Sequence, residues 1–251
     1  MIKILGIIPA RFASTRFPGK PLADILGKPM IQHVYERVMK AEKLHDVLVA
    51  TDDTRIYDCV KNFGGHVVMT DSNLPNGTAR CEEAVRIYGN APIDAVINIQ
   101  GDEPLMNPVM IDEVAELLCD NECVTLCREL DSDFENPNVV KVVMSQDNNA
   151  LYFSRSLIPY KRNKINLPVY QHIGIYGYSV KFLREYVSLS NTPLSDAESL
   201  EQLKILEHGR KIYVKVTQCK DESIGVDTPE DLERVRRIIK DAGVQACSSS
   251  K

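Results

Sequence analysis

The sequence predicts an α/β protein with a mainly parallel sheet flanked by helices and a smaller antiparallel insertion. From residue 1 to about 130, short apolar runs alternate with longer amphipathic stretches, which is typical of repeated strand–helix–strand units. Between residues 131 and 209, strand candidates follow one another closely and polar turns separate them. That pattern favours antiparallel pairing, because tight turns join neighbouring antiparallel strands.

Four apolar runs in the first half are strand candidates: Lys3–Ile8, Asp46–Ala50, His66–Met69 and Ala95–Ile99. Between them, apolar residues at helical spacing predict one helix around Ile31 to Val38 and another around Ile56 to Phe63. Gly64 and Gly65 end the second helix. These helices would cover the sheet.

The second half has three more strand candidates, Val139–Met144, Ala150–Ser154 and His172–Tyr178. A helix is expected between Pro193 and Gly209, and Thr228-Pro229 opens a last amphipathic helix through about Lys240. We therefore expect a single α/β domain over residues 1–242, with a core of about 1–130 and 210–242 and the insertion at 131–209. Residues 243–251 are expected to form a disordered tail.

Composition excludes several classes of protein. The 251 residues carry a net charge of −5, so there is no basic field to hold a nucleic acid. No apolar run approaches the roughly 20 residues that cross a bilayer, and the first residues lack a signal peptide, which predicts a cytoplasmic protein with no membrane partner. The seven cysteines, including Cys119, Cys123 and Cys127, lack disulfide or zinc spacing and are expected to be reduced.

The loop after the first strand is rich in cations. Arg11, Arg16 and Lys20 interleave with Ser14 and Gly19 at the carboxyl edge of the sheet, where ligands of α/β proteins bind. Cationic side chains and backbone amides at this density can bind several phosphates at once, so a triphosphate is the predicted ligand. No Gly-x-Gly-x-x-Gly follows the strand, and Pro follows Lys20, which excludes a dinucleotide site and a Walker loop.

Two acids stand at the ends of other apolar runs. Asp102 follows the strand Ala95–Ile99 in Gln100-Gly101-Asp102, and Asp227 follows a short run before the last helix. A carboxylate that faces phosphates needs a bridging cation, and Mg²⁺ commonly uses one or two carboxylates plus substrate phosphates. Mg²⁺ is therefore the predicted cofactor, although helix capping is a competing interpretation of Asp227. Capping is also favoured for Asp52 and Asp53.

The order of these motifs resembles that of the 3-deoxy-manno-octulosonate cytidylyltransferase family over nearly all of residues 2–240. The resemblance is carried by Ile8-Pro9-Ala10-Arg11, Pro18-Gly19-Lys20-Pro21-Leu22, Ala50-Thr51-Asp52-Asp53, Asn76-Gly77-Thr78, Asn98-Ile99-Gln100-Gly101-Asp102-Glu103-Pro104, Tyr152-Phe153-Ser154-Arg155, His172-Ile173-Gly174-Ile175-Tyr176, Leu200-Glu201-Gln202-Leu203 and Gly225-Val226-Asp227-Thr228-Pro229. It implies a Rossmann-like nucleotide-diphospho-sugar transferase fold and a homodimer. The insertion would bind the sugar and form the dimer contact.

The resemblance also implies roles for individual residues. The nucleotide would be bound by Pro9, Ala10, Arg11, Ser14, Arg16, Lys20, Asn76, Gly77, Thr78, Arg80 and Asp102. The sugar acid would be bound by Gln100, Arg155, His172, Tyr176, Glu201 and Gln202, with Arg155 facing its carboxylate. Asp102 and Asp227 would hold Mg²⁺, and the catalytic set would be these two acids with Arg11 and Lys20. Without the resemblance, His172 would be assigned a structural role, because a histidine that opens an apolar strand is more often structural than catalytic.

The implied reaction is transfer of CMP from CTP to the anomeric hydroxyl of 3-deoxy-D-manno-octulosonate (Kdo), with release of pyrophosphate, for lipopolysaccharide synthesis. Two alternatives stay open. The acceptor could be a related sugar acid, such as 8-amino-Kdo or a nonulosonic acid. The protein could also sense a nucleotide without turnover, although the presence of both Asp102 and Asp227 argues against that.

Overall fold

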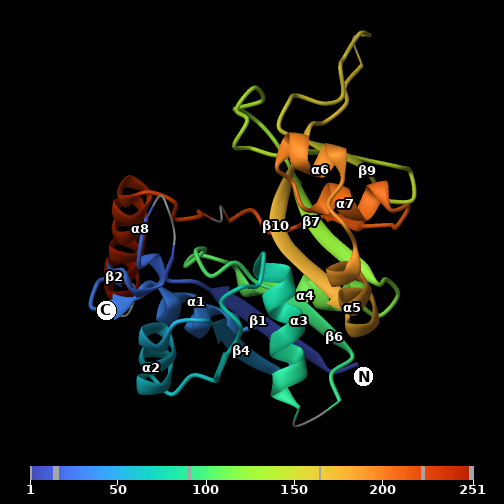
Figure 1. Ribbon diagram of the computed structural model, residues 1–251. Coiled ribbons are helices and arrows are strands. Elements are labelled where there is room, and N and C mark those ends of the chain that lie inside the picture. Colours follow the sequence, from blue (N-terminus) through green and yellow to red (C-terminus); the bar gives the residue numbers. More distant parts are fainter. Residues whose placement is uncertain (1, 14–16, 90–91, 164, 222–223, 249–251) are drawn as a thin grey trace.

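The computed structural model describes residues 2–13, 17–89, 92–163, 165–221 and 224–248, with side chains as far as residue 242 (Figure 1). A central sheet has the strand order β11-β7-β10-β6-β1-β4-β5. Its strands are β1 Ile4–Ala10, β4 Asp46–Thr51, β5 Val67–Met69, β6 Ala95–Asn98, β7 Cys123–Glu129, β10 Tyr170–Ser179 and β11 Tyr213–Val216. β1 pairs in parallel with β4 and β6, which confirms the predicted mainly parallel sheet.

The antiparallel part differs from the prediction. We expected it beside the main sheet, but β10 lies inside that sheet and pairs antiparallel with both β6 and β7. The first residues of β10 also pair with β8 (Lys141–Met144), which pairs with β9 (Ala150–Ser154). The run from Ile175 to Tyr178 is buried throughout, as in a strand covered on both faces. Strands β7 and β11 and the short hairpin of β2 (Asp24–Ile25) and β3 (Lys28–Pro29) were not predicted from the sequence.

Helices cover both faces of the sheet. On one face lie α1 (Met30–Val38), α2 (Thr54–Asn62) and α4 (Pro108–Leu117), and on the other lie α3 (Gly77–Tyr88) and α5 (Val180–Ser188). The alternation of β1 assigns its side chains to the two layers: Ile4 and Ile8 pack in the first and Leu5 and Ile7 in the second. Each such fully buried side chain contributes roughly 1.5–3 kcal/mol to folding, so β1 is a central element of the core.

The C-terminal half contains more helix than expected. Two short helices, α6 (Pro193–Glu198) and α7 (Gln202–Glu207), replace the single helix predicted there, because Ser199 takes a left-handed φ of 50° between them. The last helix, α8 (Pro229–Ser248), packs against β2 in a third apolar cluster. It continues into the predicted tail, since Gly243 only weakens helix formation, and residues 249–251 lie outside the described part.

Two further expectations can be compared with the structure. The six cysteines whose side chains are described are free thiols, in agreement with the predicted reduced state. Within the described residues, none of the helices combines the length and the apolar character needed to cross a membrane.

Candidate active site

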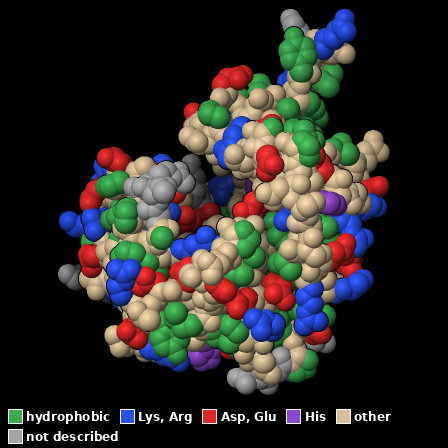
Figure 2. Space-filling view, in the orientation of Figure 1, with side chains coloured by type: hydrophobic (Ala, Val, Ile, Leu, Met, Phe, Trp, Pro, Cys, Tyr) green, Lys and Arg blue, Asp and Glu red, His purple; other side chains and the backbone are tan. Residues whose placement is uncertain are grey.

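Two cavities meet at the carboxyl edge of the parallel strands. The larger has a volume of about 490 Å³ and the smaller about 310 Å³. Gly77, Gln100 and Glu201 line both, so the cavities are adjacent. Figure 2 shows a hollow with charged side chains at its floor, between the part that carries α8 and the part that carries α6 and α7. The larger cavity is called the nucleotide cleft below, and the smaller the sugar pocket.

Most of the predicted nucleotide-binding residues converge on the nucleotide cleft. Its lining includes Pro9, Ala10, Arg11, Lys20, Asn76, Gly77, Arg80 and Asp102. Thr78 lines the sugar pocket instead. The predicted phosphate ligands Ser14 and Arg16 lie outside the described residues.

Two glycines bring the charged loops to the end of β1. Gly19 has a φ of 72° and its amide donates to the Phe12 carbonyl at 2.9 Å, which closes the loop before the short 3-10 helix η1 (Lys20–Leu22). A Cβ at Gly101 would lie 2.8 Å from the Pro9 carbonyl oxygen. Only glycine permits so close an approach between the two chain segments, and this approach places Asp102 beside Lys20.

The Lys20 ammonium lies between the two predicted metal ligands. Its Nζ is 2.7 Å from Oδ2 of Asp102 and 3.2 Å from Oδ1 of Asp227. The capping interpretation of Asp227 was wrong, because Thr228 and Asp231 cap α8 through reciprocal bonds. The Asp231 amide donates to Oγ1 of Thr228 at 3.2 Å, and the Thr228 amide donates to Oδ2 of Asp231 at 2.9 Å. Asp227 is therefore not the cap of α8, and its Oδ1 contacts Lys20, which lines the nucleotide cleft.

This geometry fits a divalent cation. Asp102 and Asp227 converge on a single cationic atom, so one cation at that point can contact both carboxylates. Among the described residues, no three or more His, Cys, Asp or Glu side chains form a group that could enclose a metal. A site of two carboxylates, completed by substrate phosphates and water, is the arrangement that Mg²⁺ commonly adopts.

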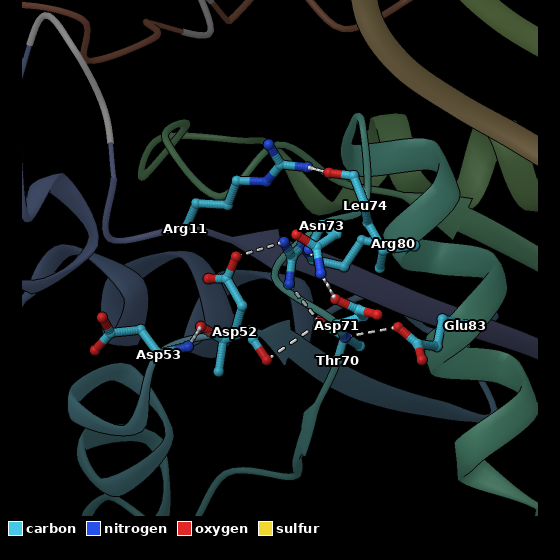
Figure 3. A network of polar contacts seen from close by, with 10 residues as sticks. Arg11, Asp52, Asp53, Thr70, Asp71, Asn73, Leu74, Arg80 and Glu83 are labelled. Carbon is cyan, nitrogen blue, oxygen red and sulfur yellow. Dashed lines mark hydrogen bonds and ion pairs between the residues drawn. The ribbon is translucent and has the colours of Figure 1, made fainter.

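The Arg80 guanidinium contacts other side chains of the protein, which the sequence did not predict. Although it lines the cleft, its guanidinium is fully buried and pairs with Asp52 at 2.7 Å, and it also donates to Oγ1 of Thr70 (Figure 3). Burial lowers the pKa of Arg80 and the Asp52 carboxylate opposes that shift. Arg80 thus ties α3 to the ends of β4 and β5. Arg80 also lines the nucleotide cleft, and its predicted contact with the nucleotide stays a prediction.

Asn76 and Arg11 both line the nucleotide cleft. Asn76 caps α3, since its Oδ1 accepts from the Ala79 amide at 2.9 Å. Arg11 extends across the cleft and donates to the Leu74 carbonyl (Figure 3). The predicted capping role of Asp53 is confirmed, because its Oδ1 accepts from the Arg55 amide at 2.9 Å.

The sugar pocket gathers five of the six residues predicted for it: Gln100, His172, Tyr176, Glu201 and Gln202. Arg155 is not in its lining. The Arg155 guanidinium instead donates to backbone carbonyls, to Glu198 at 2.7 Å and to Pro137 at 3.0 Å. These contacts hold the guanidinium outside the pocket lining, and the predicted pairing of Arg155 with a sugar carboxylate stays a prediction.

Several residues of the sugar pocket escaped the sequence analysis. Tyr186 on α5 donates its hydroxyl to Glu201 at 3.2 Å, and Tyr178 stacks on Tyr176. Burial raises the pKa of both Tyr176 and Tyr178 well above the ordinary value, so the two hydroxyls stay protonated. Asn98 was detectable as a polar residue at the end of an apolar strand. Tyr178 and Tyr186 are indistinguishable from core residues in the sequence.

Comparison with known proteins assigns this site to a family. The cytidylyltransferase family profile matches residues 5–212. The chain is 50% identical to 3-deoxy-manno-octulosonate cytidylyltransferase of Parabacteroides distasonis, over 93% of this chain and 97% of that protein. It is 48% identical to 8-amino-3,8-dideoxy-manno-octulosonate cytidylyltransferase of Shewanella pealeana, over 90% of this chain and 94% of that protein.

A solved structure agrees with these relatives. CMP:2-keto-3-deoxy-manno-octonic acid synthetase complexed with CTP superposes with a TM-score of 0.89 at 40% identity, covering 96% of this chain and 99% of that one. The profile, the identities and the superposition all extend over most of the chain. The chain therefore belongs to the 3-deoxy-manno-octulosonate cytidylyltransferase family.

Proposed function

We propose that this protein transfers CMP from CTP to the anomeric hydroxyl of Kdo and releases pyrophosphate. The observation that carries the proposal is the junction of the two cavities at Gln100 and Glu201, close to the point where Lys20 contacts Asp102 and Asp227. A triphosphate in the larger cavity and a sugar acid in the smaller would bring the α-phosphorus and the anomeric oxygen together at this junction. The family relationship gives the substrates.

The chain's own residues would act mainly by positioning and by charge. In-line attack of the anomeric oxygen on the α-phosphorus expels pyrophosphate, so negative charge develops on the leaving oxygens. Lys20 and Arg11 line the nucleotide cleft and would stabilise that charge. Gln100 donates to the Gly174 carbonyl at 3.2 Å, which fixes its side chain between the cavities. No covalent intermediate on the protein is required.

Asp102 and Asp227 would hold Mg²⁺, which the geometry of the two carboxylates supports. The ion, when bound, would neutralise phosphate oxygens and increase the acidity of the attacking hydroxyl. Lys20 would then exchange part of its contact with the carboxylates for contact with phosphate.

The test is pyrophosphate release from CTP and Kdo, with Mg²⁺ present or chelated and with UTP or ATP in place of CTP. Release that requires CTP, Kdo and Mg²⁺ together supports the proposal. Absence of release with every pair of nucleotide and sugar acid would refute it and favour the nucleotide-sensing alternative.

The 8-amino sugar is the second candidate acceptor, because relatives named for both sugars match this chain at 48–50% identity. Competition between equal concentrations of Kdo and 8-amino-Kdo, with the two CMP-sugars separated by mass, distinguishes them. A product ratio that favours the amino sugar would keep the reaction and change the acceptor.

We further propose a cytoplasmic homodimer that supplies lipopolysaccharide synthesis. The dimer is supported by large apolar side chains exposed around the insertion, with Leu151 61% exposed, Tyr160 89% and Ile165 61%. Large exposed apolar side chains are candidates for an interaction surface. Sedimentation at micromolar concentration tests the dimer, and a monomer would refute it.

A further inference from the structure

A buried threonine contacts the histidine of the sugar pocket. Thr125 on β7 is fully buried, and its Oγ1 lies 3.0 Å from Nε2 of His172. The same Oγ1 lies 2.7 Å from the Ile175 carbonyl oxygen and 3.2 Å from that of Ile173. Thr125 does not line the sugar pocket, whereas its neighbours His172 and Tyr176 do, so an effect of Thr125 on a bound sugar acid acts through them.

The three contacts determine where the hydrogens lie. A hydroxyl has a single hydrogen to donate, and a carbonyl oxygen can only accept. At 2.7 Å from the Ile175 oxygen, the Thr125 hydroxyl must donate to it, because two oxygens without a hydrogen between them would repel at that distance. The lone pairs of Oγ1 then face Nε2 of His172, so Nε2 carries the hydrogen and donates it.

An irregularity in β10 creates this arrangement. The register of β10 against β7 shifts between Ile173 and Tyr176, so Gly174 and Ile175 are extra residues on the β10 side. The two carbonyls that flank Gly174 both turn toward Thr125. Side chains alternate between the two faces of a strand, so an insertion of two residues leaves His172 and Tyr176 on the same face. Both residues line the sugar pocket.

The surroundings also keep the imidazole uncharged. Desolvation lowers the pKa of His172 to about 3, and its ring packs edge-on against Phe153 and beside Tyr176. The ring contacts Thr125, Phe153 and Tyr176, and none of the three carries charge near neutral pH, while Glu201 lines the same pocket. A neutral imidazole with its hydrogen on Nε2 has a free lone pair on Nδ1.

We infer that Thr125 is a positioning residue for the sugar site: it holds His172 in the Nε2–H tautomer, so that Nδ1 accepts a hydrogen bond from a hydroxyl of the sugar acid. This inference rests on the proposed function for the identity of the ligand, but the tautomer itself does not depend on it. His172 is then an acceptor and takes no part in proton transfer during the reaction.

The test compares the tautomer and the kinetics of Thr125→Val with those of the matched control Thr125→Ser. Nitrogen-15 spectra of histidine-labelled wild-type protein without substrates should show the hydrogen of His172 on Nε2, Thr125→Ser should keep it there, and Thr125→Val should lose this preference. A wild-type spectrum with the hydrogen on Nδ1, or a Thr125→Val spectrum like that of the wild type, would overturn the inference. Because these spectra need no turnover, they stand even where the proposed reaction fails.

With substrates that react, Thr125→Val should raise KM for the sugar acid about 5- to 30-fold, which corresponds to the loss of roughly one hydrogen bond. The KM for CTP should stay unchanged. In a His172→Ala background the same substitution should have no further effect on the sugar KM. An equal rise in both KM values, or a full effect of Thr125→Val in the absence of His172, would show a general structural role and refute positioning.

Discussion

The pair formed by Arg80 and Asp52 offers the sharpest test of how the nucleotide cleft is supported. The Arg80 side chain is 0% exposed and the Asp52 side chain 15%, with 2.7 Å between the charged atoms. We consider Arg80→Met, which keeps most of the apolar volume and removes the charge. The substitution leaves the Asp52 carboxylate largely buried without its partner and removes a donor to Thr70.

Removing one member of a buried pair typically costs about 3–5 kcal/mol, because the remaining charge is desolvated without compensation. Asp52 retains some access to water, so we expect a loss near the lower limit, about 3 kcal/mol. For a chain of this length, each kcal/mol lowers Tm by about 2–4 °C, so Tm should fall by about 6–12 °C. Asp52→Asn should also destabilise the fold, and the double variant should lose less than the sum of the two.

The measurement is the free energy of unfolding in urea, monitored by circular dichroism, with Arg86→Met as the control. Arg86 lies on the same helix, is 67% exposed and pairs with Glu83 at 3.0 Å. Glu83 is 16% exposed, about as much as Asp52, but the Arg86 guanidinium is open to water, so we expect this pair to contribute about 0.2–1 kcal/mol. The reasoning is refuted if Arg80→Met and Arg86→Met lower the free energy of unfolding equally, because burial would then have no effect on the strength of the pair.

Three more predictions concern the site and its support. Asp102→Asn should reduce turnover more than tenfold with an unchanged circular dichroism spectrum, and a variant that keeps over a tenth of the rate, a loss under about 1.4 kcal/mol, would remove Asp102 from the mechanism. The His172 ring should show no titration between pH 8 and pH 5 in proton spectra, since a pKa of about 3 keeps the folded state neutral there, whereas an inflection near the ordinary value would contradict the desolvation. Thr228→Ala should cost about 1 kcal/mol through loss of the α8 cap, and an unchanged urea midpoint would show that Asp231 caps the helix alone.

The sequence predicted the fold well where periodicity and turn chemistry agree. The four strands of the first half and helices α1 and α2 lie where their apolar patterns place them. β7 was missed because Cys123–Glu129 mixes apolar and polar residues over a length that either a strand or a short helix could have. The position of β10 depends on pairing with segments about 50 and 80 residues away, which local patterns do not encode.

For the site, sequence motifs found the charged residues but not their partners. Lys20 and Asp102 were recognised from loops at strand ends, and the structure brings them within 2.7 Å. The sequence did not reveal that Arg80 and Arg155 have acceptors within the protein, because a guanidinium in a motif is predicted to bind a ligand whether or not such acceptors lie nearby. Asp52 and the Glu198 carbonyl are those acceptors, and only the folded chain brings them close.

The place of β10 in the sheet has a consequence for how the chain folds. β6 and β7 are consecutive strands along the chain, yet β10 separates them, so the sheet stays open at its middle until residues 170–179 have been synthesised. β5, β4, β1 and β6 can assemble first from local units, and β7 and β11 join only when β10 fills the gap. Because β10 also carries His172 and Tyr176, closing the sheet and forming the sugar pocket are one step of folding.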